Sequence, residues 1–181
     1  MKLTNILNEV RLEYKTKYGY DPTTFDEENL QESYIMLSEL LNPANAYDYK
    51  TIGNGMWQYE DMFGNQLFVR LVYQPVKDGH FEFKTWWIDE DGNKVYNEVP
   101  QGSSAKDWDK RTDTVAKIFR DEALPKFKQN NTTDKLVFLP VTKSRYLFSM
   151  RMIKKFIPNS WEIIEDFPKS ITIVKDGNNT E

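Results

Sequence analysis

Between residues 56 and 99 this chain alternates apolar and polar residues with a period of two, and turn sequences interrupt the alternation. Side chains of a strand point alternately to its two faces, so each run indicates a strand with one buried face. The predicted buried positions of the two longest runs are Leu67, Val69, Leu71, Tyr73, Phe81, Phe83, Thr85 and Trp87. Glycine-containing turns lie at residues 63–65, 78–79 and 91–93. Strands joined by such short turns must pair antiparallel, since parallel pairing needs a long crossover.

Outside this region the apolar spacing is mostly helical. It predicts four helices, over residues 3–14, 26–41, 108–123 and 144–157. Pro125 is expected to end or kink the third helix, because its ring clashes with the carbonyl four residues earlier. Short apolar runs predict further strands at 136–139, 161–165 and 171–174.

These elements together predict an α+β fold. Its centre is a mainly antiparallel mixed sheet of about six or seven strands, accompanied by the four helices. The length of 181 residues fits one domain, which we place at residues 1–175. The polar residues 176–181 are expected to form a disordered tail.

The composition excludes several classes of site. The chain has no cysteine, so disulfides, thiolate metal sites, iron–sulfur clusters and cysteine nucleophiles are excluded. No run approaches the ~20 apolar residues that span a bilayer, and no apolar signal peptide opens the chain. We therefore expect a cytoplasmic protein without a membrane partner. The formal net charge of −4 makes nucleic acid an unexpected partner.

A basic stretch stands out against this acidic background, because residues 135–161 hold six lysines and arginines and no acidic residue. On a helix that begins near Ser144, Arg145 lies in the first turn, beside exposed backbone N–H groups. Such a Ser-Arg pair can hold a phosphate or carboxylate through charge-assisted hydrogen bonds. The alternative is a solvated helix face, with Arg145 paired to an acid of the first two helices. The candidate ligand-binding residues are Lys143, Ser144, Arg145, Arg151, Lys155 and Trp86.

Trp86 joins the candidates because neighbouring strand residues point to opposite faces, so at most one of Trp86 and Trp87 faces the main core. Trp87 is expected in that core, while Trp86 is either buried on the second face or exposed for stacking. His80, the only histidine, follows a turn and belongs to no nucleophile motif, so it reads as a turn residue. Residues 89–91 read as a solvated hairpin tip, because no calcium-loop pattern continues from them; no metal site is predicted.

The predicted order of elements is helix, helix, hairpin strands, helix, strand, helix, strand, strand. This order resembles the Gcn5-related N-acetyltransferase fold without its first strand. The resemblance implies acetyl-CoA wedged between two splayed parallel strands, here those over residues 81–88 and 136–139. Such enzymes hold the cofactor pyrophosphate on a Q/R-x-x-G-x-G/A loop that opens a helix. The corresponding residues, 101–107, have one glycine and lack that spacing.

A second resemblance covers roughly residues 105–165. A T-V-x-x-I helix core at 114–118, the strand at 136–139 and the Ser144-Arg145 pair that opens a helix resemble a family of small phage-encoded proteins. No biochemical activity is assigned to that family. The resemblance therefore implies a viral or mobile-element origin more than a reaction.

Three functions are weighed on these observations. The first is a phage-type accessory protein that binds another protein or a small anionic ligand through the surface of residues 143–155, without a cofactor. The second is a divergent N-acyltransferase of the Gcn5-related kind, which uses acetyl-CoA. The third is a single-stranded nucleic-acid module that uses exposed aromatic rings and the basic helix. No catalytic constellation is recognisable, so the sequence leans away from an enzyme and leaves the question open.

Overall fold

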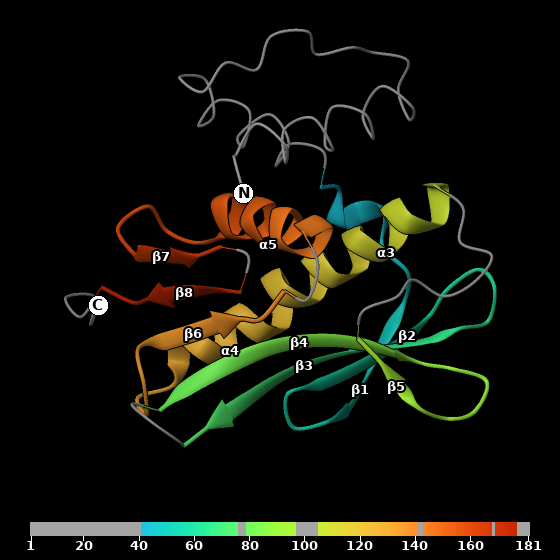
Figure 1. The fold of residues 1–181 in the computed structure, drawn as a ribbon, viewed down its shortest axis with the longest axis horizontal. Coiled ribbons are helices and arrows are strands. Elements are labelled where there is room, and N and C mark those ends of the chain that lie inside the picture. Colours follow the sequence, from blue (N-terminus) through green and yellow to red (C-terminus); the bar gives the residue numbers. More distant parts are fainter. Residues whose placement is uncertain (1–40, 76–78, 97–104, 141–142, 168, 177–181) are drawn as a thin grey trace, which may run out of the picture.

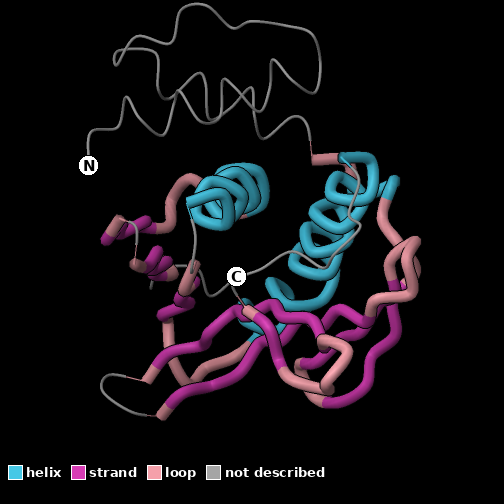
Figure 2. Tube along the Cα trace, turned by 45° about the vertical axis from the view of Figure 1, so that its right-hand side comes forward, coloured by secondary structure: helices cyan, strands magenta, loops and turns pink. Residues whose placement is uncertain are grey.

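The computed structural model describes residues 41–75, 79–96, 105–140, 143–167 and 169–176, apart from the side chains of 105–108 and 143–144. Within these ranges the protein has two layers, a mixed sheet and a layer of helices on one side of it (Figures 1 and 2). The two helices predicted before residue 41 fall outside the described residues, as do residues 177–181 of the predicted tail.

The sheet contains eight strands in the order β1-β2-β3-β4-β6-β8-β7, and β5 pairs with β4 beside this path. All neighbouring pairs are antiparallel except β4 and β6, which are parallel. The predicted mixed, mainly antiparallel sheet is thus confirmed, with one strand more than the prediction allowed. The strands are β1 (Tyr49–Gly53), β2 (Met56–Glu60), β3 (Gln66–Gln74), β4 (His80–Ile88), β5 (Lys94–Val95), β6 (Lys135–Phe138), β7 (Glu162–Asp166) and β8 (Ser170–Val174).

The described part of the chain contains two long helical segments, where the sequence predicts four helices over the whole chain. The first segment runs through α3 (Ala105–Ile118), the π-helical turn η3 (Phe119–Ala123) and α4 (Leu124–Gln129), and the second is α5 (Lys143–Phe156). A short 3-10 turn, η2 (Pro43–Asn45), precedes β1. No helix among the described residues is long and apolar enough to cross a membrane.

Pro125 does not end the first helical segment. It follows the π turn, in which the N–H of Leu124 donates to the carbonyl of Phe119, five residues earlier. A proline lacks the N–H that an α-helix needs and crowds the carbonyl four residues before it, and the wider π turn makes room for both defects. The segment therefore continues to Gln129 as α4.

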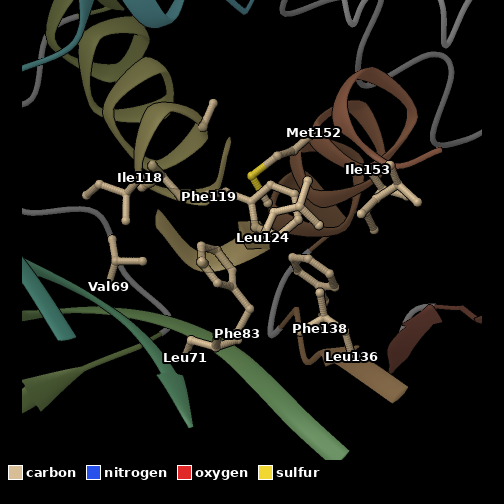
Figure 3. Packing of buried hydrophobic residues seen from close by; sticks show 14 of the residues in the cluster. Val69, Leu71, Phe83, Ile118, Phe119, Leu124, Leu136, Phe138, Met152 and Ile153 are labelled. Atoms are coloured by element: carbon tan, nitrogen blue, oxygen red, sulfur yellow. The ribbon is translucent and has the colours of Figure 1, made fainter. Parts of the chain in front are cut away.

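The core lies between the helices and the facing side of the sheet (Figure 3). Leu71 lies opposite Phe83 in the β3–β4 ladder, and Phe138 lies opposite Phe83 in the β4–β6 ladder. The ring of Phe83 therefore meets two others, with centroids 5.2 Å from Phe119 of η3 and 5.4 Å from Phe138. The period-two pattern correctly predicts that Leu67, Val69, Leu71 and Phe83 are buried on this face, but Tyr73, which was predicted there too, is 37% exposed.

Two turns at the same end of the sheet share the sequence D-x-x-G-N. In each, the aspartate Oδ1 accepts the N–H of the asparagine, at 2.9 Å from Asp61 to Asn65 and 2.7 Å from Asp89 to Asn93. Each asparagine also donates its side-chain amide to Oδ2 of the same aspartate. The glycine adopts a positive φ of 82° in both turns. Residues 89–93 are therefore a self-contained hairpin tip, as the sequence predicts.

Candidate ligand-binding cleft

The parallel strands β4 and β6 pair over only three residues. Their register runs from Phe81 opposite Leu136 to Phe83 opposite Phe138, after which β6 ends. β4 continues to Ile88, and its next partner on that side is Val95 of β5, opposite Trp87. The sheet therefore opens between these two pairings.

Backbone groups of Thr85 face this opening. The N–H of Leu71 donates to Gly55 on the β2 side, so odd residues of β3 point to β2 and even residues point to β4. By the same alternation, even residues of β4 point to β3 and odd residues point away from it. Thr85 is the odd residue between the β6 and β5 pairings, so its N–H and C=O point into the opening.

A cleft of about 230 Å³ occupies the opening, with α5 across one side of it. This volume is below the ~300 Å³ of the smallest typical ligand pockets, so it suits a small molecule or one group of a larger one. Its walls are mainly apolar, with a few polar groups among them, which is the usual composition of a ligand site. They are Phe83, Lys84, Thr85, Tyr96, Phe138, Leu139, Pro140, Arg145, Phe148, Ser149 and Met152.

Arg145 is the candidate residue that the structure places in this cleft. Burial lowers the pKa of its guanidinium group, and the interaction with Tyr59 raises the pKa in part. Arginine nevertheless keeps its proton in proteins, so the cleft contains a cation with reduced access to water. A carboxylate or phosphate that enters the cleft can accept charge-assisted hydrogen bonds from this guanidinium.

Of the other basic candidates, Lys155 is the one that the structure shows to lie apart from Arg145. Lys155 lies about 15 Å farther along α5 by helix rise, and its Nζ donates to the backbone carbonyl of Leu41 at 2.7 Å. Arg151 is half-buried. Lys143 and Ser144 begin α5, but their side chains lie outside the described residues. The structure thus assigns Arg145 and Lys155 to different places.

Trp86 is buried, with 6% of its surface exposed, on the sheet face opposite the helices. Its ring stacks on Phe68 at 5.4 Å, and Tyr96 and the Nζ of Lys94 cover it from the β5 hairpin. The sequence left open whether Trp86 is buried on the second sheet face or exposed for stacking, and the structure shows it buried. Trp87 is half-buried and packs against the main core, as predicted.

His80 begins β4 and contacts a polar group on the sheet face opposite the helices. Its Nε2 lies 3.4 Å from Oε1 of Glu82, whose carboxylate also accepts hydrogen bonds from Lys84 at 2.5 Å and Gln74 at 2.9 Å. Glu82 is buried among these neighbours. His80 is therefore part of a small polar network.

Sequence reasoning did not find Thr85, Ser149 or Tyr96 as cleft residues. They come from β4, from α5 and from the residue after β5, and no local motif joins them. One signal was available, because the strand predicted at 81–88 is twice as long as the strand predicted at 136–139. Two paired strands of unequal length leave part of the longer one without a neighbour.

In comparisons with known proteins, no family model, curated protein or solved structure matches the chain. The proposed function therefore depends on the geometry of the cleft.

Proposed function

We propose that this protein binds a small anionic ligand in the cleft between β4 and β6, with Arg145 as its counter-charge. One observation supports this most directly. The two parallel strands separate after three paired residues, and the half-buried guanidinium of Arg145 lines the space that results.

The lining indicates what kind of anion fits. A carboxylate or phosphate suits the guanidinium of Arg145, which can donate two parallel hydrogen bonds to either group. The aliphatic or aromatic part of the ligand would pack against Phe138, Phe148 and Met152. A ligand amide would find the N–H and C=O of Thr85 as partners. A small acid with an apolar body meets these requirements.

A binding role of this kind agrees with an accessory protein that has no catalytic centre. The phage-encoded origin implied by the Ser-Arg motif stays a prediction. The sequence leaves open whether the ligand is a protein or a small anion. We propose a small anion, because Arg145 lines a cleft and not a broad surface.

Isothermal titration of the full chain with hexanoate, phenylacetate and phenyl phosphate tests the proposal. At least one acid should bind, and Arg145→Gln should weaken its binding about tenfold, the loss expected for one charge-assisted hydrogen bond. Arg151→Gln is the matched control, because it removes the same charge from the same helix outside the cleft lining. Failure of all three acids, or equal affinity of Arg145→Gln and the unchanged protein, would contradict the proposal.

A second candidate function is acyl transfer from acetyl-CoA, in the manner of the Gcn5-related enzymes. The observation that favours it is one parallel strand pair within a mainly antiparallel sheet, opening over a cleft as the resemblance implies. The loop expected to hold the pyrophosphate falls largely at 101–104, outside the described residues. Titration with acetyl-CoA separates the two candidate functions. If acetyl-CoA binds more weakly than millimolar while a small acid binds, acyl transfer is ruled out and binding of a small anion remains.

A further inference from the structure

A second possible site lies where β3 extends beyond β2. The register between these strands ends at Met56 opposite Arg70, but β3 continues to Gln74. The last hydrogen bond on this side runs from the N–H of Leu71 to the carbonyl of Gly55, at 2.8 Å. Tyr73 is the next residue of β3 whose N–H and C=O point to the same side. No described strand lies beside it there.

An open hollow of about 480 Å³ occupies this position. Its walls are the β1–β2 turn, the projecting end of β3 and the end of α4, and its polar lining residues include Asn54, Gln129 and Asn130. Leu71 and Tyr73 line it from the sheet face that carries the helices, and Val72 lines it from the opposite face. The hollow therefore wraps around the edge of β3.

The charges of the hollow are all positive among the described residues that line it. They belong to Arg70 and Lys126, and neither residue forms an ion pair with a described residue. This is a local excess of positive charge in a chain whose formal net charge is −4. It favours a negatively charged partner.

The two cations lie on opposite faces of the sheet edge. Arg70 is opposite Lys84 in the β3–β4 ladder, on the face without helices. Lys126 belongs to α4 on the other face, where its Nζ lies 5.0 Å from the ring centre of Trp57. A compact anion can approach only one face at a time. An extended peptide directs neighbouring side chains to both faces at once.

We propose that this hollow binds an acidic peptide in extended conformation, which adds to the edge of β3 where no described strand pairs with it. The backbone of the peptide pairs with the N–H and C=O of Tyr73, as in other cases of strand addition. Two consecutive acidic residues then reach Lys126 on one face and Arg70 on the other. Tyr73 and Phe81, whose rings lie 5.5 Å apart, provide an apolar surface beside the peptide.

Fluorescence anisotropy with the full chain tests this proposal. The probe is a short, blocked, labelled peptide with Asp-Glu at its centre and Val and Thr around it, and the comparison peptide carries Lys-Lys instead. The acidic peptide should bind and the basic one should not. Arg70→Glu and Lys126→Glu should each weaken binding by about tenfold or more. Lys169→Glu is the matched control, with the same charge change at an exposed residue outside the hollow.

Two further measurements test the backbone pairing, the first with a changed peptide and the unaltered protein, the second with variants of Tyr73. A probe in which an ester replaces the central amide loses a backbone donor and should bind several-fold more weakly. On the protein side, Tyr73→Pro removes the outward N–H together with the ring, whereas Tyr73→Val removes the ring alone, so only Tyr73→Pro should abolish binding. The proposal is wrong if the basic peptide binds as well as the acidic one. It is also wrong if ester and amide probes bind equally, or if inorganic phosphate displaces the peptide at equal concentration.

Discussion

Arg111 of α3 donates a hydrogen bond from Nη2 to Oδ2 of Asp61, and the two side chains form a buried ion pair between the helix and the β2–β3 turn. Asp61 also accepts the backbone N–H groups of Phe63 and Asn65 through Oδ1, each at 2.9 Å. One carboxylate thus closes a turn and ties that turn to a helix fifty residues later in the chain.

Replacing this carboxylate should cost far more than replacing its counterpart in the second D-x-x-G-N turn. Asp61→Ala removes the Asp61 carboxylate from the buried Arg111, and we expect the free energy of unfolding to fall by about 3–5 kcal/mol. Asp89→Ala removes similar turn hydrogen bonds at an exposed tip and should cost about 1 kcal/mol. Urea denaturation of both variants measures the difference. Equal losses would show that the ion pair contributes nothing beyond the turn.

The network around Glu82 predicts a pH-dependent stability. Burial raises the pKa of Glu82, but hydrogen bonds from Lys84 and Gln74 lower it more, and the net pKa lies below the ordinary 4.5. A carboxylate with a lowered folded-state pKa stabilises the protein above the unfolded-state pKa, and this contribution disappears as the pH falls through the folded-state value. Glu82→Gln should therefore lower the free energy of unfolding by about 1–3 kcal/mol at neutral pH and by progressively less below about pH 4.5.

Denaturation curves at several pH values test this expectation. Glu60→Gln is a suitable control, because it removes a carboxylate from an exposed residue of β2. A stability difference between Glu82→Gln and the unchanged protein that stays constant with pH would rule out the carboxylate network as its source.

Gly55 and Gly64 should respond differently to the same substitution. Both have a positive φ, 71° and 82°, which costs an L-residue about 1–2 kcal/mol. A Cβ at Gly55 would also lie 2.5 Å from the carbonyl oxygen of Leu71, whereas at Gly64 it would meet no atom within 4 Å. Thermal or urea unfolding should show a loss of about 2–5 kcal/mol for Gly55→Ala and about 1–2 kcal/mol for Gly64→Ala. Similar losses would mean that the β1–β2 turn moves away from β3 at little cost.

Arg145 is expected to be needed for ligand binding. Arg145→Met keeps much of the side-chain volume but removes the charge and its hydrogen-bond donors. Binding of the small acids should be lost in the same variant. A large loss of stability would instead assign Arg145 a structural role.

The sequence predicts β3 because burial alternates along it, whereas β4 and β7 are predicted although their burial does not alternate strictly. In β3 the residues Leu67, Val69 and Leu71 are buried between more exposed neighbours, and the period-two pattern shows this directly. In β1 no residue is fully buried and four of the five are exposed, so its sequence carries no such pattern. That strand is held by backbone pairing with β2, which side-chain periodicity does not report.

The helix prediction was also limited, because it used only residues that are near one another in the sequence. Pro125 is predicted to end or kink the third helix. The helical segment does not end there, and its hydrogen bonding changes from α to π just before the proline. The cleft was harder to foresee, because its walls meet only after β4, β6 and α5 are assembled. Of its lining, the sequence identified Arg145, through the charge contrast with the rest of the chain.

The three-residue pairing of β4 with β6 also has a consequence for how this protein folds. It joins a block of sequence-local hairpins, β1 to β4, to a second block formed by β6, β7 and β8, and these segments are separated by the whole of α3, η3 and α4. Closing so long a loop costs entropy before any contact repays it. We expect the hairpin block to form first and the junction last. Amide hydrogens at the junction should then exchange with solvent faster than the amide hydrogens of the β3–β4 ladder, because a smaller opening of the native state exposes them.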